Sequence, residues 1–238
     1  MNYNLEHFIE ELNKLHIELD ENQINQFINY YEMLIEKNKV MNLTAITDFD
    51  EVIDKHFIDS LNLFRLVDLK SEKYILDLGT GAGFPGIPLK IAFPNIRIVL
   101  ADSLNKRILF LKDVVDNLCL NDVECVHGRA EDLARNSSYR ESFDLCVSRA
   151  VANLSTLSEY CIPFVKKGGQ FISYKSDNCE EEINSSKVAI SKLGGKISKV
   201  ENFKIGENGR SFVVIDKVEN TPKKFPRKAG LPSKEPLK

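Results

Sequence analysis

A cluster of glycines directly after a short apolar run is the first feature of the sequence that suggests chemistry. Residues 77–86 read Asp-Leu-Gly-Thr-Gly-Ala-Gly-Phe-Pro-Gly. Glycines in such a turn let backbone N–H groups approach a ligand closely, and a proline at the first turn of the following helix costs no hydrogen bond. The pattern predicts a nucleotide-containing cofactor bound at Gly79, Thr80 and Gly81.

Two cofactors are compatible with this glycine turn. Residues 81–86 match the Gly-x-Gly-x-x-Gly pattern of dinucleotide sites, and Asp102 follows at about the spacing of 20 residues that this pattern expects. The carboxylate of Asp77, however, would repel a pyrophosphate and attract the ammonium and sulfonium groups of S-adenosylmethionine. Asp77 therefore favours the methyl donor.

Acidic residues after the next two apolar runs extend the expected cofactor site. The two oxygens of Asp102, which Ser103 follows, can accept hydrogen bonds from the ribose hydroxyls, although Asp102 also suits a helix N-cap. The Ala130 backbone and the Glu131 side chain are expected at the adenine edge. An acid in the first turn of a helix is the alternative role of Glu131.

The elements that must position these residues change character near residue 71. Before it, apolar residues recur at helical spacing and predict three helices; after it, short apolar runs alternate with amphipathic stretches. Such alternation implies a parallel sheet with helices on both faces. The expected strands are residues 74–78, 96–101, 123–127, 143–148 and 169–174, and the expected helices between them are residues 85–93, 104–118, 153–165 and 180–193.

The end of the chain departs from this alternation. Residues 196–205 and 211–218 flank Gly-Glu-Asn-Gly, which predicts an antiparallel hairpin. A parallel sheet finished by a hairpin is the outline of the class I S-adenosylmethionine-dependent methyltransferase fold, a Rossmann-like α/β fold with a mostly parallel seven-stranded sheet. We expect an N-terminal helical segment over residues 1–70, a methyltransferase domain over residues 71–219, and a proline-rich, extended basic arm over residues 220–238.

The charge distribution points to a polyanionic partner. The net charge is −3, yet lysine and arginine outnumber acids from Lys217 onward. We expect part of this basic set to contact phosphates and Phe225 to stack on a base, whereas Lys234 and Lys238 are expected to form a solvated tail that aids solubility. The expected phosphate contacts are Lys106, Arg107, Lys223, Lys224, Arg227 and Lys228.

Composition excludes several other classes of protein. A hydrophobic share of 43% and a charged share of 28% are ordinary for a globular protein, and no apolar run reaches the length of a membrane span. The N-terminus lacks the pattern of a secretion signal, and the five cysteines form no Cys-x-x-Cys pair. We expect a cytoplasmic protein without a metal site.

Taken together, the motifs resemble a known family over almost the whole chain: the bacterial small-subunit (16S) ribosomal RNA guanine-N7 methyltransferases, also called glucose-inhibited division protein B. The matching stretches are residues 42–44, 56–61, 77–89, 102–107, 128–131, 148–152 and 226–232. Gly-Phe-Pro-Gly-Ile-Pro after the glycine turn is the most specific of them. Ser176 departs from the family pattern, which has glycine after the lysine at that position.

The resemblance implies S-adenosylmethionine as donor and a guanine in a decoding-region loop of 16S ribosomal RNA as acceptor. It also implies that Gly79, Phe84, Ala130, Glu131 and Arg149 lie at the cofactor. The substrate would be 16S ribosomal RNA or the small ribosomal subunit, and the enzyme is expected to act as a monomer.

The chemistry of guanine N7 agrees with the residues after the fourth expected strand. N7 carries no proton, so its methylation needs alignment rather than a general base. Arg149, the expected catalytic residue, can hold the cofactor carboxylate, guanine O6 or a phosphate. His56 and Asp59 are interpreted as a packing contact. Two alternatives remain: a non-catalytic RNA-binding assembly factor and a nicotinamide-dependent oxidoreductase.

Overall fold

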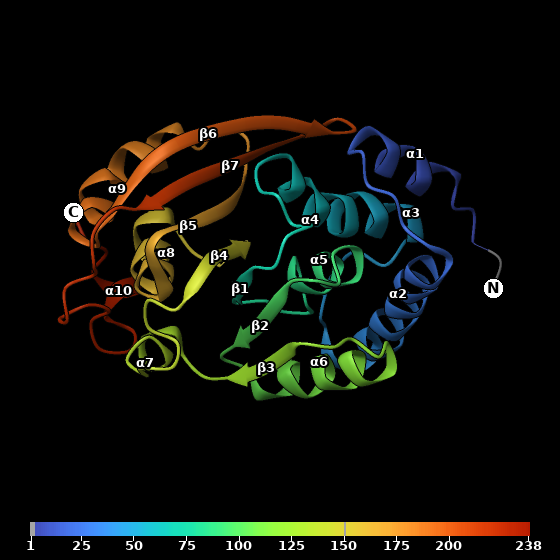
Figure 1. Ribbon diagram of the computed structural model, residues 1–238, viewed down its shortest axis with the longest axis horizontal. Helices are drawn as coiled ribbons and strands as arrows, with labels where there is room; N and C mark the ends of the chain where they lie inside the picture. The colour runs from blue at the N-terminus through green and yellow to red at the C-terminus, as the bar shows by residue number, and fades with distance from the viewer. Residues whose placement is uncertain (1–2, 150) are drawn as a thin grey trace.

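The computed structural model describes residues 3–149 and 151–238. Met1 and Asn2 lie outside the described residues, and so does Ala150, which belongs to the matching stretch 148–152. Within them the strands form a seven-stranded sheet of order β3-β2-β1-β4-β5-β7-β6 (Figure 1). The first five strands are parallel, and β7 runs antiparallel to both of its neighbours. The strands are β1 (Tyr74–Leu78), β2 (Arg97–Asp102), β3 (Val123–His127), β4 (Phe143–Arg149), β5 (Val165–Ser176), β6 (Gly195–Ile205) and β7 (Asn208–Lys217). The expected class I methyltransferase order of parallel strands and closing hairpin is confirmed.

Helices connect the strands and precede the sheet. The N-terminal helices are α1 (Glu6–Lys14), α2 (Glu21–Met41), α3 (Phe49–Val52), a π-helical turn (Ile53–Ile58), α4 (Asp59–Leu61) and a 3-10 turn (Asn62–Arg65). The later ones are α5 (Gly86–Ala92), α6 (Asn105–Asn117), α7 (Ala130–Leu133), α8 (Leu154–Cys161), a 3-10 turn (Ile162–Phe164), α9 (Glu180–Lys192) and α10 (Leu231–Lys234). A capping box between Asp20 and Gln23 starts α2.

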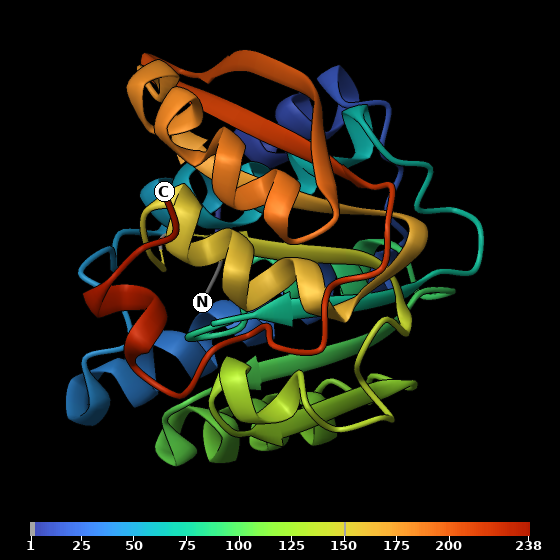
Figure 2. The ribbon, with the colours of Figure 1, turned by 90° about the vertical axis from the view of Figure 1, so that its left-hand side faces the viewer.

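Two hydrophobic cores form because successive side chains of a strand point to opposite faces of the sheet. On β1, Ile75 packs into the core built with α2, α5 and α6, whereas Leu76 packs into the core built with α8 and α9. Figure 1 shows the N-terminal helices gathered at one end of the molecule, and Figure 2 shows α8 and α9 stacked on the near side of the sheet. Both faces of the sheet are therefore covered.

The chain differs from expectation at β5 and at the C-terminal arm. β5 begins at Val165, four positions before the expected start, because an irregularity in its pairing with β4 accommodates the additional residues. The C-terminal arm (residues 220–238) is not an extended projection. It contains the short helix α10 and lies along α8 and α7, as Figure 2 shows in red. Buried Phe225 and Pro232 anchor it to the domain.

Tyr30 connects the N-terminal helices to the glycine turn. Its side chain is fully buried, and its hydroxyl donates a 2.7 Å hydrogen bond to the carbonyl of Ala82. The ring also packs against Phe57 and Phe84. One side chain of α2 thus holds the turn after β1 in place.

We expect Tyr30→Phe to lower the free energy of unfolding by about 1–3 kcal/mol, because it leaves a buried carbonyl without its donor. Urea unfolding measures the change. Tyr31→Phe is the matched control, since the Tyr31 hydroxyl bonds the carbonyl of Thr47 in an exposed setting. Equal losses in the two variants would show that burial of the Tyr30 bond is unimportant.

Candidate functional site

A cleft of about 320 Å³ lies at the carboxyl ends of β1, β2 and β3. This edge of a parallel sheet is where ligands bind in such folds, and the volume suits a small organic molecule. Five of the residues expected at the cofactor line this cleft, namely Gly79, Asp102, Ser103, Ala130 and Glu131. Val151 and Tyr160 line it as well and were not singled out in the sequence, because neither lies in the turns after β1, β2 and β3.

Asp102 is hydrogen-bonded through both oxygens. One oxygen, Oδ1, accepts from the backbone N–H of Leu104 at 2.8 Å; Leu104, and not Asp102, is the N-cap of α6. The other, Oδ2, accepts from the N–H of Gly81 at 3.0 Å and from the Arg107 guanidinium at 3.2 Å. A carboxylate has about four acceptor positions, and three are used, so Asp102 retains capacity for one hydroxyl donor from the cleft that it lines.

Asp77 lies elsewhere than the electrostatic interpretation required. Its carboxyl group is fully buried beneath the turn, where Oδ2 accepts from the Thr80 hydroxyl at 2.7 Å and from the N–H of Gly86 at 2.8 Å. Burial raises the pKa of Asp77 to about 7, although these two hydrogen bonds oppose the shift. Asp77 does not line the cleft, so its contribution is to fix the turn rather than to face the ligand.

The glycine turn closes tightly around this carboxyl group. A Cβ atom on Gly86 would lie 2.8 Å from Asp77 Oδ2, so only glycine brings its N–H to the carboxylate. Gly79 has φ +73°, and a Cβ there would lie 2.5 Å from Val151 Cγ2. Thr80 and Gly81 act through Asp77 and Asp102 rather than as cleft walls. A glycine floor, a ribose-competent carboxylate and Glu131 form a donor and acceptor set that fits an adenosine-containing cofactor.

Phe84 and Arg149 lie together on the other side of the turn, outside the lining of the cleft. The guanidinium of Arg149 is 5.1 Å from the centre of the Phe84 ring. It donates to Asp59 Oδ2 at 2.8 Å and to the carbonyl of Lys55 at 2.9 Å. Neither Arg149 nor Phe84 lines the cleft, and the N-terminal helices supply the acceptors that hold the guanidinium.

Asp59 binds a second arginine that the sequence did not reveal. Arg210, at the start of β7, donates from Nε to Asp59 Oδ1 at 2.9 Å. The two guanidiniums and one carboxylate leave the cluster with one net positive charge. Arg210 also lines a groove of about 1030 Å³ between α9 and the β6–β7 hairpin. No local pattern could have identified this pair, since 151 positions separate Asp59 from Arg210.

His56 completes the cluster in its neutral form. Burial, and next the charge of Arg149, lower the pKa of His56 to about 3. Its Nδ1 lies 3.1 Å from Arg149 Nη2, which can only donate, and 3.0 Å from the carbonyl of Lys55, which can only accept. Its Nε2 lies 2.9 Å from the Thr44 hydroxyl. The imidazole stacks on Phe84, with ring centres 4.4 Å apart.

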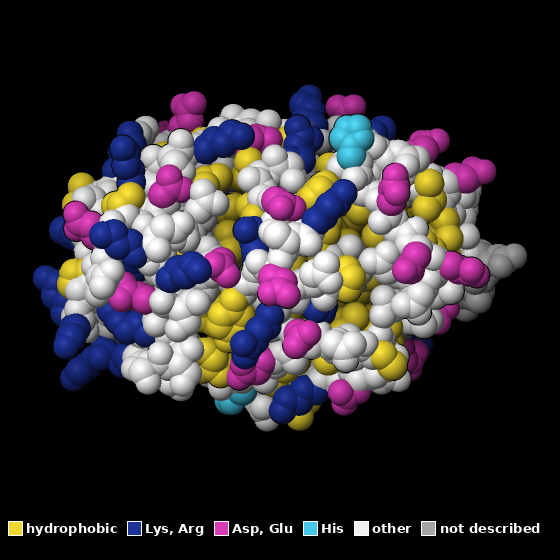
Figure 3. Space-filling model, viewed as in Figure 1, with side chains coloured by type: hydrophobic (Ala, Val, Ile, Leu, Met, Phe, Trp, Pro, Cys, Tyr) yellow, Lys and Arg dark blue, Asp and Glu magenta, His cyan; other side chains and the backbone are white. Residues whose placement is uncertain are grey.

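The residues expected at RNA phosphates divide into two groups. Lys106, Lys223, Lys224 and Lys228 are exposed. Arg107 and Arg227 instead pair with Asp102 and Glu159, and Phe225, expected to stack on a base, is buried. Figure 3 shows lysine and arginine side chains gathered at the margin of the molecule where Figure 1 places α10 and the C-terminus.

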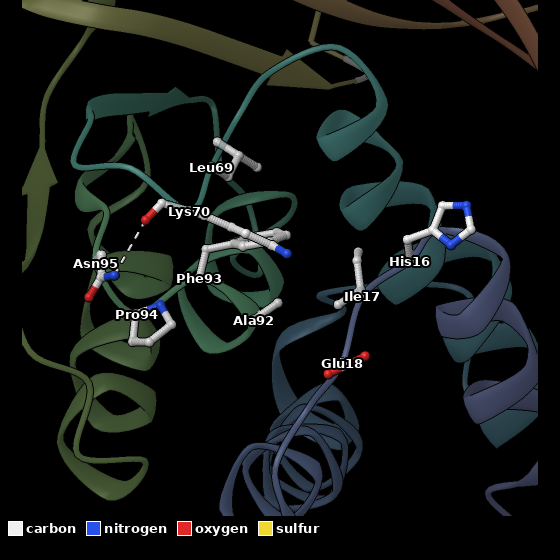
Figure 4. Close-up of a pocket in the computed structure, with 9 residues that line it drawn as sticks. All are labelled: His16, Ile17, Glu18, Leu69, Lys70, Ala92, Phe93, Pro94 and Asn95. Atoms are coloured by element: carbon white, nitrogen blue, oxygen red, sulfur yellow. Dashed lines mark hydrogen bonds between the residues drawn. The ribbon is translucent and has the colours of Figure 1, made fainter.

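A second cavity, of about 430 Å³, lies at the opposite edge of the sheet, before β1 and β2 (Figure 4). The Asn95 amide there donates to the carbonyl of Lys70 at 3.4 Å, and none of the expected cofactor or RNA residues lines the cavity. Within residues 3–149 and 151–238, no cluster of histidine, cysteine and acidic side chains could hold a metal ion. No helix in the same ranges is long and apolar enough to cross a membrane.

The raised pKa of Asp77 generates a prediction about stability. The folded protein retains a proton that the unfolded chain releases above its ordinary pKa of 3.8, so this carboxyl stabilises the fold less as the pH rises from about 4 to about 7. We expect Asp77→Asn to gain stability relative to wild type by a few kcal/mol across that window, with no further change above it. Urea unfolding at several pH values tests this. A difference independent of pH would contradict it.

Comparisons with known proteins agree with this geometry. The family model described as rRNA small subunit methyltransferase G matches residues 23–213. A relative from Lachnoclostridium phytofermentans, named ribosomal RNA small subunit methyltransferase G, is 50% identical over 232 residues, which are 97% of this chain and 96% of the relative. A relative of the same name from Clostridium kluyveri is 52% identical over 224 residues, covering 94% of each chain.

Among solved structures, a SAM-dependent methyltransferase from Aquifex aeolicus aligns with a TM-score of 0.54 and 16% identity, over 73% of this chain and 96% of that one. TYW2 of M. jannaschii, solved in complex with AdoMet, aligns with a TM-score of 0.51 and 16% identity, over 66% and 76%. These likenesses show the shared fold. The family model and the relatives go further: the chain belongs to the ribosomal RNA small subunit methyltransferase G family, a family of S-adenosylmethionine-dependent methyltransferases.

Proposed function

We propose that this enzyme transfers the methyl group of S-adenosylmethionine to N7 of a guanine in a decoding-region loop of 16S ribosomal RNA. Family membership supports the enzyme class and the RNA substrate, and it leaves the oxidoreductase and the non-catalytic assembly factor unfavoured. The choice of atom rests on the chemistry of the cluster at the end of β4.

The observation that carries the proposal is that the groups around Arg149 are unsuited to act as a general base. Both oxygens of Asp59 accept hydrogen bonds from guanidiniums. The low pKa of His56 makes its imidazole a weak base at neutral pH. Exocyclic amines must lose a proton on methylation, whereas guanine N7 presents a bare lone pair. A rigid cationic cluster without a base suits an acceptor that needs only to be aligned.

In the proposed enzyme, different groups of residues along the carboxyl edge of the sheet bind the methyl donor and the RNA. S-adenosylmethionine supplies the methyl group when bound in the cleft, where Asp102 and Glu131 orient it. Arg149 and Arg210 present positive charge to the RNA beside the groove that Arg210 lines. Exposed Lys223, Lys224 and Lys228 of the arm neutralise phosphates farther out.

The proposal also assigns roles to the segments of the chain. Residues 71–219 act as the methyltransferase domain, residues 1–70 position Arg149, and residues 220–238 form the basic arm. The residues named for the proposed site all belong to one chain, and the proposal includes that the enzyme acts as a monomer. The reaction takes place in the cytoplasm, where its RNA substrate resides.

The direct test is methyl transfer from labelled S-adenosylmethionine to small-subunit RNA, offered both naked and as the assembled subunit. We expect label in the RNA and N7-methylguanosine as the modified nucleoside after digestion. A different methylated nucleoside would overturn the assignment of the atom. Absence of transfer to both substrates, despite binding of the donor, would overturn the assignment of the acceptor.

We expect Arg149→Ala to fold normally yet lose on the order of a hundredfold in kcat, a loss typical of misalignment. Folding should survive because Asp59 keeps Arg210 as its partner. Single-turnover kinetics and thermal unfolding measure the two properties. Arg65→Ala is the control. Arg65 Nε lies 3.6 Å from Glu201 Oε1, and neither residue lines the cleft. Normal turnover in the Arg149 variant would refute its proposed role.

A further inference from the structure

The C-terminal arm is attached to the domain mainly through its backbone. Arg140 donates to the carbonyls of Phe225 and Thr221 at 2.9 and 2.8 Å, and Arg135 donates to the carbonyl of Pro226 at 2.6 Å. The family model ends at residue 213, although residues 226–232 of the arm resemble the family and a relative aligns over 97% of the chain.

A buried ion pair fixes the centre of the arm. Glu159 of α8 is fully buried, and Arg227 binds both of its oxygens, with Nε 3.0 Å from Oε1 and Nη2 2.7 Å from Oε2. The backbone N–H of Arg227 adds a 2.7 Å bond to Oε1. Undocking of the arm would leave this buried carboxylate without its cation, which is strongly unfavourable. The arm is therefore held closely against α8.

The same docked arm reaches the wall of the cofactor cleft at Glu131. Glu131 lines the cleft and is buried, and its Oε1 accepts a 2.8 Å hydrogen bond from the N–H of Gly230. Within the described part of the chain, its Oε2 makes no hydrogen bond. Tyr160 also lines the cleft, and it follows Glu159, the residue of α8 that Arg227 of the arm binds.

We propose that the C-terminal arm is part of the cofactor site: it positions Glu131 and Tyr160, so that docking of the arm and binding of the cofactor are coupled. One oxygen of Glu131 is held by the arm, which aims the other at the ligand. The inference rests on the proposed position of the cofactor in this cleft. Gly230 and Arg227 are positioning residues, because Gly230 acts through Glu131 and Arg227 acts through Glu159, the neighbour of Tyr160.

The coupling must work in both directions, since linkage between two binding equilibria is reciprocal. Cofactor in the cleft stabilises the docked arm, and whatever holds the arm tightens the cofactor. Lys223 and Lys228 are exposed on this arm. RNA bound to those lysines can therefore raise the affinity for the methyl donor through the arm, without any contact between the acceptor base and the donor.

The experiment compares S-adenosylmethionine affinity, measured by calorimetry without RNA, in the full-length wild type and three full-length variants. Arg227→Lys keeps the charge but loses the planar fork that binds both oxygens of Glu159. Gly230→Ala strains a backbone with φ +82° where a Cβ would meet no atom within 4 Å. We expect both to weaken binding, Arg227→Lys by about fivefold or more. Lys234→Gln changes only an exposed charge of the arm and should bind as wild type does.

A second readout follows the arm itself. Trypsin cleavage after Lys228 should slow when S-adenosylmethionine is added to wild type, and this protection should be reduced in Arg227→Lys. Wild-type affinity in both folded positioning variants, or cleavage unaffected by the cofactor, would overturn the coupling. Absence of S-adenosylmethionine binding by the wild type would instead overturn the proposed cofactor, on which the coupling rests. If Arg227→Lys fails to fold, Gly230→Ala and the wild-type protection assay decide the question.

Discussion

One carboxylate joins three parts of the chain. Asp59 belongs to the helical region that precedes the sheet, Arg149 ends β4, and Arg210 begins β7. A buried carboxylate needs at least one cationic partner, and by binding both arginines Asp59 ties the N-terminal helices, the parallel strands and the hairpin into one arrangement. The π-helical turn before Asp59 contributes the carbonyl of Lys55, which takes a further hydrogen bond from Arg149.

The cofactor cleft lies on one side of the glycine turn, and Asp59 with its two arginines, Arg149 and Arg210, lies on the other. Asp77 fixes that turn from below, and Tyr30 fixes it from α2. Under the proposed function, the residues that hold the donor and those that face the acceptor therefore share one element, the glycine turn. Transfer of a methyl group depends on the distance and alignment of two reactants, and a shared turn keeps both constant.

Much of the fold follows from the sequence because it depends on local patterns. The apolar runs locate β1 and β3 to the residue, and the glycine turn places the cleft. The partners of charged side chains are different, because the fold alone decides them. Asp77 was expected to face the ligand and is buried. Arg149 was expected at the cofactor and binds Asp59, which lies 90 positions earlier in the chain.

For the C-terminal arm too, the composition predicts the basic character of the segment but not how the segment packs on the domain. Its prolines and lysines predicted an extended basic segment, and the exposed lysines agree with that pattern. The attachment of the arm to α8 could not be predicted from the sequence, because nothing near Arg227 in the chain distinguishes it from the other basic residues. Its partner, the buried Glu159, is identified only in the folded structure. Long-range pairing of this kind leaves no periodic trace in the sequence.

The position of the arm also sets an order of events during synthesis. A chain emerges from the ribosome N-terminus first, and its domains fold as their residues become available. Gly230, which contacts the cleft wall at Glu131, follows all seven strands in the chain. A nascent chain can thus form its parallel strands first, and its cleft acquires the complete wall only after the arm has been made.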